Sequence, residues 1–117
     1  MTLDEAVKKD YELRAKLLEA IAQKHQLEAR ALGKVEACAL GNWLHGEAER
    51  KFVFIKSYRP CADAHAAFHA EAEKVARLIN LEEYAQAEAA LADGSPYVKA
   101  FGVLLKAVLQ LKKDARL

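Results

Sequence analysis

The stretch CADAHAAFHA, residues 61–70, places two histidines four positions apart in a run of alanines. Alanine is the strongest helix former, and side chains four residues apart lie on the same side of a helix with Cβ atoms about 5–6 Å apart. The sequence therefore predicts a helix over about residues 61–79 that presents His65 and His69 side by side, with His65 toward the core. The other inward-facing positions of this helix are Cys61, Phe68, Ala72, Val75 and Ile79.

The composition is typical of a globular protein. Hydrophobic residues make up 53% of the 117 residues and charged residues 30%, and the formal net charge is +1. This balance predicts a single domain, residues 1–117, with a sizeable core. Without a basic block, nucleic acid and anionic membrane surfaces are not expected as partners. No leader and no apolar run of about 18 residues stands out, so we expect a cytoplasmic protein without membrane insertion.

Helices are expected along almost the whole chain, because apolar residues recur at helical spacing without sustained alternation. The opening TLDE fits a capping box, with Thr2 as the N-cap and Glu5 reaching back to it. From there one long helix is expected to run to about Leu32, just before Gly33. Its inward-facing positions are Leu3, Ala6, Asp10, Leu13, Leu17 and Ala20.

The region that follows, about 35–59, is less regular, because Gly41 and Gly46 divide it into short helical pieces. Two more helices are expected after the histidine helix, over about 81–92 and 96–113. The last one has Ser95 as its N-cap and the inward-facing positions Val98, Phe101, Leu105 and Val108. Short connections between long helices imply antiparallel neighbours. The predicted fold class is therefore all-α, an antiparallel four-helix bundle with a short additional helical segment that carries the cysteine motif.

Two residues outside the histidine helix have the chemistry of metal ligands. Cys38 opens the motif CALGNWL, residues 38–44, and its thiolate together with imidazole nitrogens favours zinc over magnesium or calcium. Asp10 lies on the apolar side of the first helix, where a lone carboxylate needs a partner or a metal. Asp10, Cys38, His65 and His69 would complete a tetrahedral zinc site. The alternative is that the histidines are core residues bonded to backbone carbonyls, and spacing alone leaves both open.

The sequence resembles the chemoreceptor zinc-binding (CZB) domain family over nearly its whole length. CALGNWL at 38–44 matches the family motif CxxGxW(I/L), and HAAFH at 65–69 matches its HxxxH pair. The family site uses three histidines and one cysteine, which implies Zn²⁺ held by Cys38, His65 and His69 here. The first family motif, HxxW, is not retained, because DYELRAKLLEAI at 10–21 places Asp10 at the histidine position and Leu13 at the tryptophan.

The replacement of histidine by Asp10 leaves three arrangements open. The carboxylate can ligate zinc directly, it can hold a bound water, or the site can have three protein ligands and an open position. We prefer direct ligation. Cys61, one turn before His65, is a further candidate for the fourth ligand, but a small buried apolar residue is the favoured interpretation of it.

The resemblance implies a regulatory function. The resemblance to CZB domains implies a homodimer that is attached to chemoreceptor signalling domains or diguanylate cyclases. In such proteins zinc occupancy, or oxidation of the cysteine by an oxidant such as hypochlorous acid, alters the output. We therefore expect a sensory zinc domain of bacterial chemotaxis or cyclic-di-GMP signalling, with such an output domain or protein as partner. The alternative is a structural helical module in which zinc only stabilises the fold. No positioned base or nucleophile is evident, so we do not expect an enzyme.

Overall fold

The computed structural model describes residues 3–35 and 38–117, and in these ranges helices are the only regular secondary structure, which confirms the all-α class. The expected N-cap Thr2 lies outside the described residues. No helix in the described ranges is both long and apolar enough to cross a membrane. In chain order the helices are α1 (Leu3–Gln23), α2 (Ala29–Gly33), α3 (Ala39–Leu44), α4 (Glu47–Phe52), α5 (Tyr58–Asn80), α6 (Tyr84–Ala90) and α7 (Pro96–Asp114).

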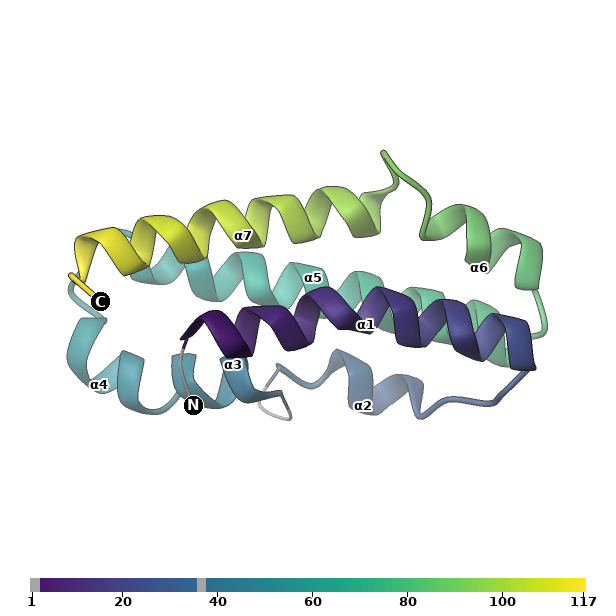
Figure 1. Ribbon diagram of the computed structural model, residues 1–117. Helices are drawn as coiled ribbons and strands as arrows, with labels where there is room; N and C mark the ends of the chain where they lie inside the picture. The colour runs from purple at the N-terminus through teal and green to yellow at the C-terminus, as the bar shows by residue number, and fades with distance from the viewer. Residues whose placement is uncertain (1–2, 36–37) are drawn as a thin grey trace.

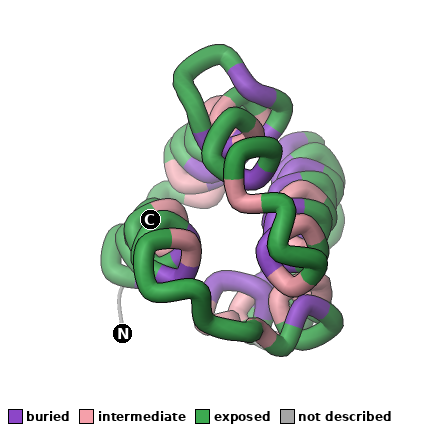
Figure 2. Tube along the Cα trace, turned by 90° about the vertical axis from the view of Figure 1, so that its right-hand side faces the viewer, coloured by how far each residue is buried: buried purple, intermediate pink, exposed green. Residues whose placement is uncertain are grey.

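The three long helices α1, α5 and α7 lie side by side and give the molecule extents of 43 × 25 × 19 Å (Figure 1). α1 and α5 run in the same direction, and α7 runs back along α5. The short helices α2, α3 and α4 follow one another on the opposite side of α5 from α7. Seen along the helices, buried residues face the interior and exposed residues face outward (Figure 2).

The first helix is shorter than the sequence predicts, because α1 ends at Gln23 and not near Leu32. Lys24 adopts a left-handed backbone conformation with φ of +57°, and the amide of the next residue, His25, donates to the carbonyl of Ala20 at 3.0 Å. This arrangement is a Schellman cap, which normally has glycine at the left-handed position. A lysine there carries no sequence signal for a helix end.

The segment after α1 is held in place by the last residue of α5. The side-chain amide of Asn80 donates to the carbonyl of Leu27 at 2.8 Å, and its oxygen accepts from the Leu27 amide at 2.7 Å. Both backbone polar groups of Leu27 are therefore satisfied by one side chain. As a result the chain turns back, and α2 packs against α5 instead of extending α1 (Figure 1).

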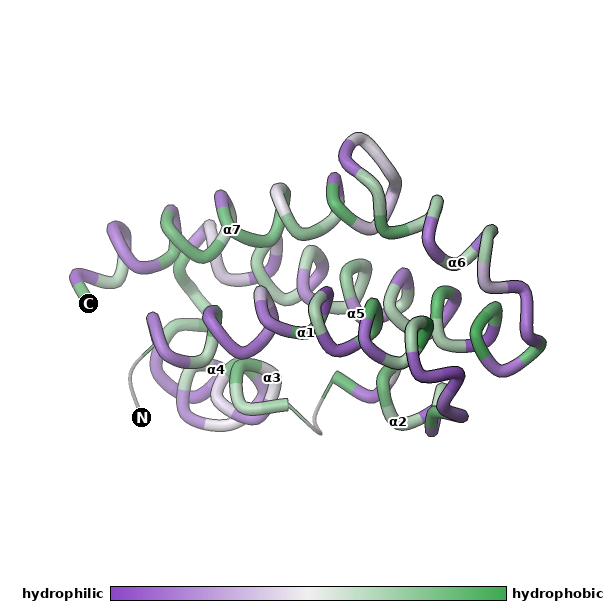
Figure 3. Tube along the Cα trace, turned by 45° about the vertical axis from the view of Figure 1, so that its right-hand side comes forward, coloured by the Kyte–Doolittle hydropathy of each residue, from purple (hydrophilic) through white to green (hydrophobic). Residues whose placement is uncertain are grey.

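The core follows the inward faces expected for α1 and α5. On α5 the six expected positions are all buried: Cys61, His65, Phe68, Ala72, Val75 and Ile79. On α1 the buried positions are Ala6, Asp10, Leu17 and Ala20. Figure 3 shows how hydrophobic residues recur along α5 and α7 with hydrophilic residues between them.

The inward face of α7 differs from the expectation, because Tyr97 and Leu104 are buried, whereas the expected Val98 and Phe101 are only half-buried. Leu105 is 38% exposed, whereas its neighbour Leu104 is fully buried. The buried residues Leu104, Val108 and Leu111 follow one another at helical spacing. The sequence pattern therefore fits this face of α7 as well as the neighbouring face with Leu105. Packing against α5 selects between them. The start of α7 is as expected, since the Ser95 hydroxyl accepts from the amide of Val98 at 3.3 Å.

We predict that Asn80→Ala lowers the free energy of unfolding by about 2 kcal/mol, because two hydrogen bonds to a half-buried peptide are lost. Urea denaturation followed by circular dichroism measures this. Gln86→Ala, which removes an exposed amide from α6, is the control and should change stability little. Equal effects of the two substitutions would contradict the anchoring role of Asn80.

Candidate metal centre

Four side chains with metal-binding chemistry meet at one point inside the molecule. Asp10 comes from the middle of α1, Cys38 from the residue before α3, and His65 and His69 from α5. One possible ligand atom of each lies within 4.8 Å of those of the other three. The structure thus brings together the four residues that the sequence analysis selected, from three separate segments.

The contacts within this cluster are short. The Nε2 atom of His65 lies 3.1 Å from the Cys38 sulfur and 3.3 Å from Oδ2 of Asp10. The Nε2 atom of His69 lies 3.4 Å from Oδ1 of Asp10. Asp10, His65 and His69 are buried, whereas Cys38 is half-buried. A single ion at the centre could therefore be reached by a carboxylate oxygen, a sulfur and two nitrogens.

Helix α2 orients one of the two histidines. The Nδ1 atom of His69 lies 2.8 Å from the backbone carbonyl of Leu32 and can only donate to it, so the proton sits on Nδ1. The Nε2 atom then faces Asp10 and can ligate a metal once it has lost its proton. A histidine that ligates a metal usually donates its other N–H in this way. Leu32 was not selected from the sequence, because its carbonyl reaches His69 only after α2 turns back.

The position of Cys38 depends on Gly41. Cys38 is the N-cap of α3, and its sulfur accepts from the amide of Gly41 at 3.2 Å. A Cβ atom at Gly41 would collide with the backbone carbonyl of Val35 and lie 3.0 Å from Cε1 of His65. The spacing of the CxxG motif thus has a physical reason. The backbone of α3 can approach the histidine only where no side chain intervenes.

The charges in the cluster complement one another. Burial by itself would raise the pKa values of Asp10 and Cys38, but the close imidazoles of His65 and His69 outweigh burial and lower both. The pKa of the Cys38 thiol falls to about 6, which favours the thiolate. Burial would lower the pKa of each histidine, but contacts with Asp10 and Cys38 raise both, that of His69 to about 10. A metal bound at this centre would therefore have to displace protons held by the histidines.

The donor atoms suit zinc. Within the cluster, Oδ2 of Asp10, Nε2 of His69 and Nδ1 of His65 are buried without a hydrogen-bond partner, and the first two belong to the common centre. Such unpartnered groups are costly unless a further partner satisfies them. One sulfur, two imidazole nitrogens and one carboxylate oxygen form a tetrahedral set typical of zinc and of no alkaline-earth ion. These residues fit a zinc ion.

The alternative ligand Cys61 lies outside the cluster as the structure describes it. Its side chain is fully buried in the core, and burial raises the pKa of its thiol to about 11. This environment favours the neutral thiol, which is a poor ligand. The remaining two histidines, His25 and His45, are exposed.

The comparison with protein families agrees with this geometry. The sequence model of the chemoreceptor zinc-binding domain matches residues 11–76, and the chain belongs to this family. The matched range contains Cys38, His65 and His69 and begins just after Asp10. No curated protein and no solved structure matches the chain.

We predict that Gly41→Ala lowers the free energy of unfolding by about 2 kcal/mol, because the added methyl group is forced against the Val35 carbonyl and His65. Gly102→Ala is the matched control. Gly102 lies within α7 with open space at its Cβ position, so alanine there should raise stability by up to about 1 kcal/mol. Urea denaturation of both variants measures the difference, and a neutral Gly41→Ala would contradict the close approach.

Proposed function

We propose that the chain is a regulatory zinc domain in which Asp10, Cys38, His65 and His69 together bind one Zn²⁺. The observation that carries this proposal is the convergence of four ligand atoms within 4.8 Å, two of them buried and unpartnered. Membership of the chemoreceptor zinc-binding family supports the choice of metal. Four protein ligands make a closed site without a free position for substrate, so we propose no enzymatic activity.

Direct ligation by Asp10 is supported by the directions of its oxygens. Each carboxylate oxygen faces the Nε2 atom of a different histidine, and the residue is only 4% exposed. Zinc bound there would be neutralised by one thiolate and one carboxylate. With the histidine of the family motif in place of Asp10, the same site would keep a net positive charge. Asp10 thus reduces the net charge that is buried together with the ion.

The sensory role is supported by the position of Cys38. The other three residues lie on long helices in the core, whereas Cys38 is half-buried and lines a surface pocket with Trp43 and Arg50. Water, chelators and oxidants can reach the sulfur there. Loss of the metal, or oxidation of the thiolate by an oxidant such as hypochlorous acid, would release α3 from α5 and α1 while the long helices remain packed.

The proposal extends to the arrangement of the helices and to the oligomeric state and output partner of the domain. We propose an antiparallel four-helix bundle in which α2, α3 and α4 together form the fourth member beside α1, α5 and α7, and not the additional segment that the sequence predicted. We propose that a cytoplasmic homodimer of this domain passes its state to a chemoreceptor-type or diguanylate cyclase-type output. The competing function, a structural zinc module, requires that the fold depends on the metal.

We predict that the purified chain binds about one zinc ion, and that Cys38→Ala and His69→Ala lose most of it by elemental analysis. Cys61→Ala is the matched control for Cys38→Ala and should keep full occupancy. Asp10→Ala should weaken zinc binding at least tenfold, whereas Asp10→His should bind at least as tightly as the parent chain. Unchanged affinity in Asp10→Ala would contradict direct ligation.

A second prediction separates the sensor from the structural module. After chelation the sensor should keep most of its helical circular dichroism, and amide hydrogen exchange should accelerate in α3 far more than in α5. Re-addition of zinc should reverse the change. In Cys38→Ala the chelator should have no further effect. Loss of all helical signal on chelation would instead support the structural module.

A further inference from the structure

A pocket of about 270 Å³ lies between α1 and α7, next to the metal centre, with which it shares only Asp10. Its walls are mainly aromatic and aliphatic side chains: Tyr11, Ala15 and Leu18 from α1, and Tyr97, Val98 and Phe101 from α7. Sites for small molecules are typically concave, mostly apolar and equipped with a few polar groups that orient the ligand. The volume is close to the lower end of the range for such sites, about 300 Å³.

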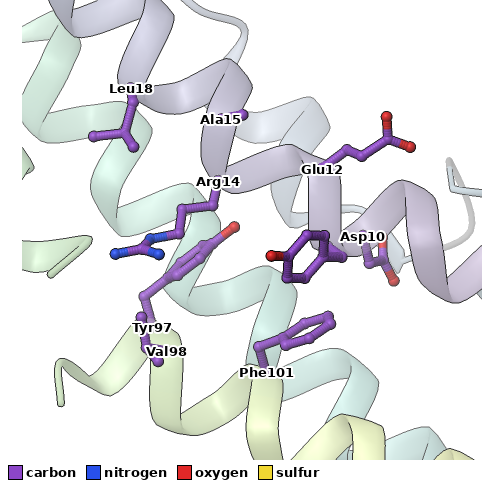
Figure 4. A pocket seen from close by; sticks show the side chains of 9 residues that line it. Asp10, Glu12, Arg14, Ala15, Leu18, Tyr97, Val98 and Phe101 are labelled. Carbon is purple, nitrogen blue, oxygen red and sulfur yellow. The ribbon is translucent and has the colours of Figure 1, made fainter. Parts of the chain in front are cut away.

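One hydrogen-bond donor in this pocket is without a partner. Tyr97 is only 3% exposed, and its hydroxyl makes no hydrogen bond to any residue that the structure describes. Figure 4 shows its ring reaching from α7 across the pocket toward α1. A buried hydroxyl without a partner costs free energy that an acceptor on a bound molecule would recover.

Burial and the nearby Asp10 carboxylate raise the pKa of Tyr97, so its hydroxyl stays protonated, and Arg14 is the basic group of the pocket lining. The Nε of Arg14 donates to the carbonyl of Leu91 at 2.8 Å, which fixes the guanidinium at the pocket. Its other contact is a 3.5 Å ion pair with the 98% exposed Asp93, a geometry that contributes little. Of the two acidic residues in the lining, Asp10 faces the histidines, and Glu12 points away from Tyr97 in Figure 4.

We propose that this pocket binds a small aromatic carboxylate. The ring of the ligand packs against the aromatic side chains of α1 and α7, and its carboxylate accepts from the Tyr97 hydroxyl and pairs with Arg14. The pocket size limits the ligand to about one ring. This site uses none of the sulfur or imidazole atoms of the metal centre, so it adds a second binding activity to the proposed zinc function.

Benzoate and its uncharged analogue benzamide test the proposal on the full, zinc-supplied chain. Titration followed by amide NMR should show benzoate shifting resonances of residues 11–18 and 98–101, with at least fivefold tighter binding than benzamide. Tyr97→Phe should weaken benzoate binding about tenfold. The melting temperature of this variant should equal or exceed that of the parent, because the hydroxyl has no partner to lose. Tyr84→Phe, on α6, is the matched control and should leave binding unchanged.

Three results would overturn the proposal. Equal affinity for benzoate and benzamide would contradict an ion pair between the ligand and Arg14. Unaltered benzoate affinity in Tyr97→Phe would contradict a hydrogen bond from the Tyr97 hydroxyl. Shifts of the same resonances on raising the protein concentration alone, with a matching rise in sedimentation coefficient, would show that a second copy of the chain fills the pocket. None of these readouts depends on metal affinity, so the zinc proposal is judged separately.

Discussion

The contact between the Asp10 carboxylate and the two imidazoles of α5 is the interaction on which the interior depends. Two helices that belong to distant parts of the chain meet there through buried polar groups, 3.3 and 3.4 Å apart. Buried charges are tolerated only when paired or bound to a metal, so α1 can pack on α5 in one register only. That register determines where the sulfur of Cys38 must lie to reach Asp10 and the histidines. It also determines which residues of α1 face α7.

The short helices α2 and α3 position the residues that surround the contact between Asp10 and the two histidines. α2 turns back because of a lysine-based Schellman cap and the Asn80 anchor, and the carbonyl of Leu32 then holds His69 in one orientation. α3 places the sulfur of Cys38 through a backbone approach that only glycine permits at position 41. The segment between the two long helices is thus irregular for a chemical reason. This segment brings the Leu32 carbonyl to His69 and the Cys38 sulfur to His65, and one continuous helix could not supply both contacts.

Asp10 separates two environments. Its oxygens face a polar centre of sulfur and nitrogen, while its helix borders an apolar pocket with a basic and a phenolic group. Cys38, on the opposite side, is the only member of the cluster that is half-exposed. The cluster is therefore buried at three residues and accessible at the fourth, which lies on the short segment before α3.

The sequence by itself determined the features that depend on neighbours along the chain. The buried face of α5, the Ser95 cap of α7 and the cysteine and histidine motifs all follow from spacings of three or four residues, so local rules were enough. The tertiary structure decided between alternatives that local sequence rules cannot distinguish. It ended α1 at Gln23, where lysine occupies a position that sequence rules assign to glycine, and it turned Leu104 inward in place of Leu105. It also formed the pocket around Tyr97. Each of these depends on contacts between residues far apart in the chain, which no local pattern records.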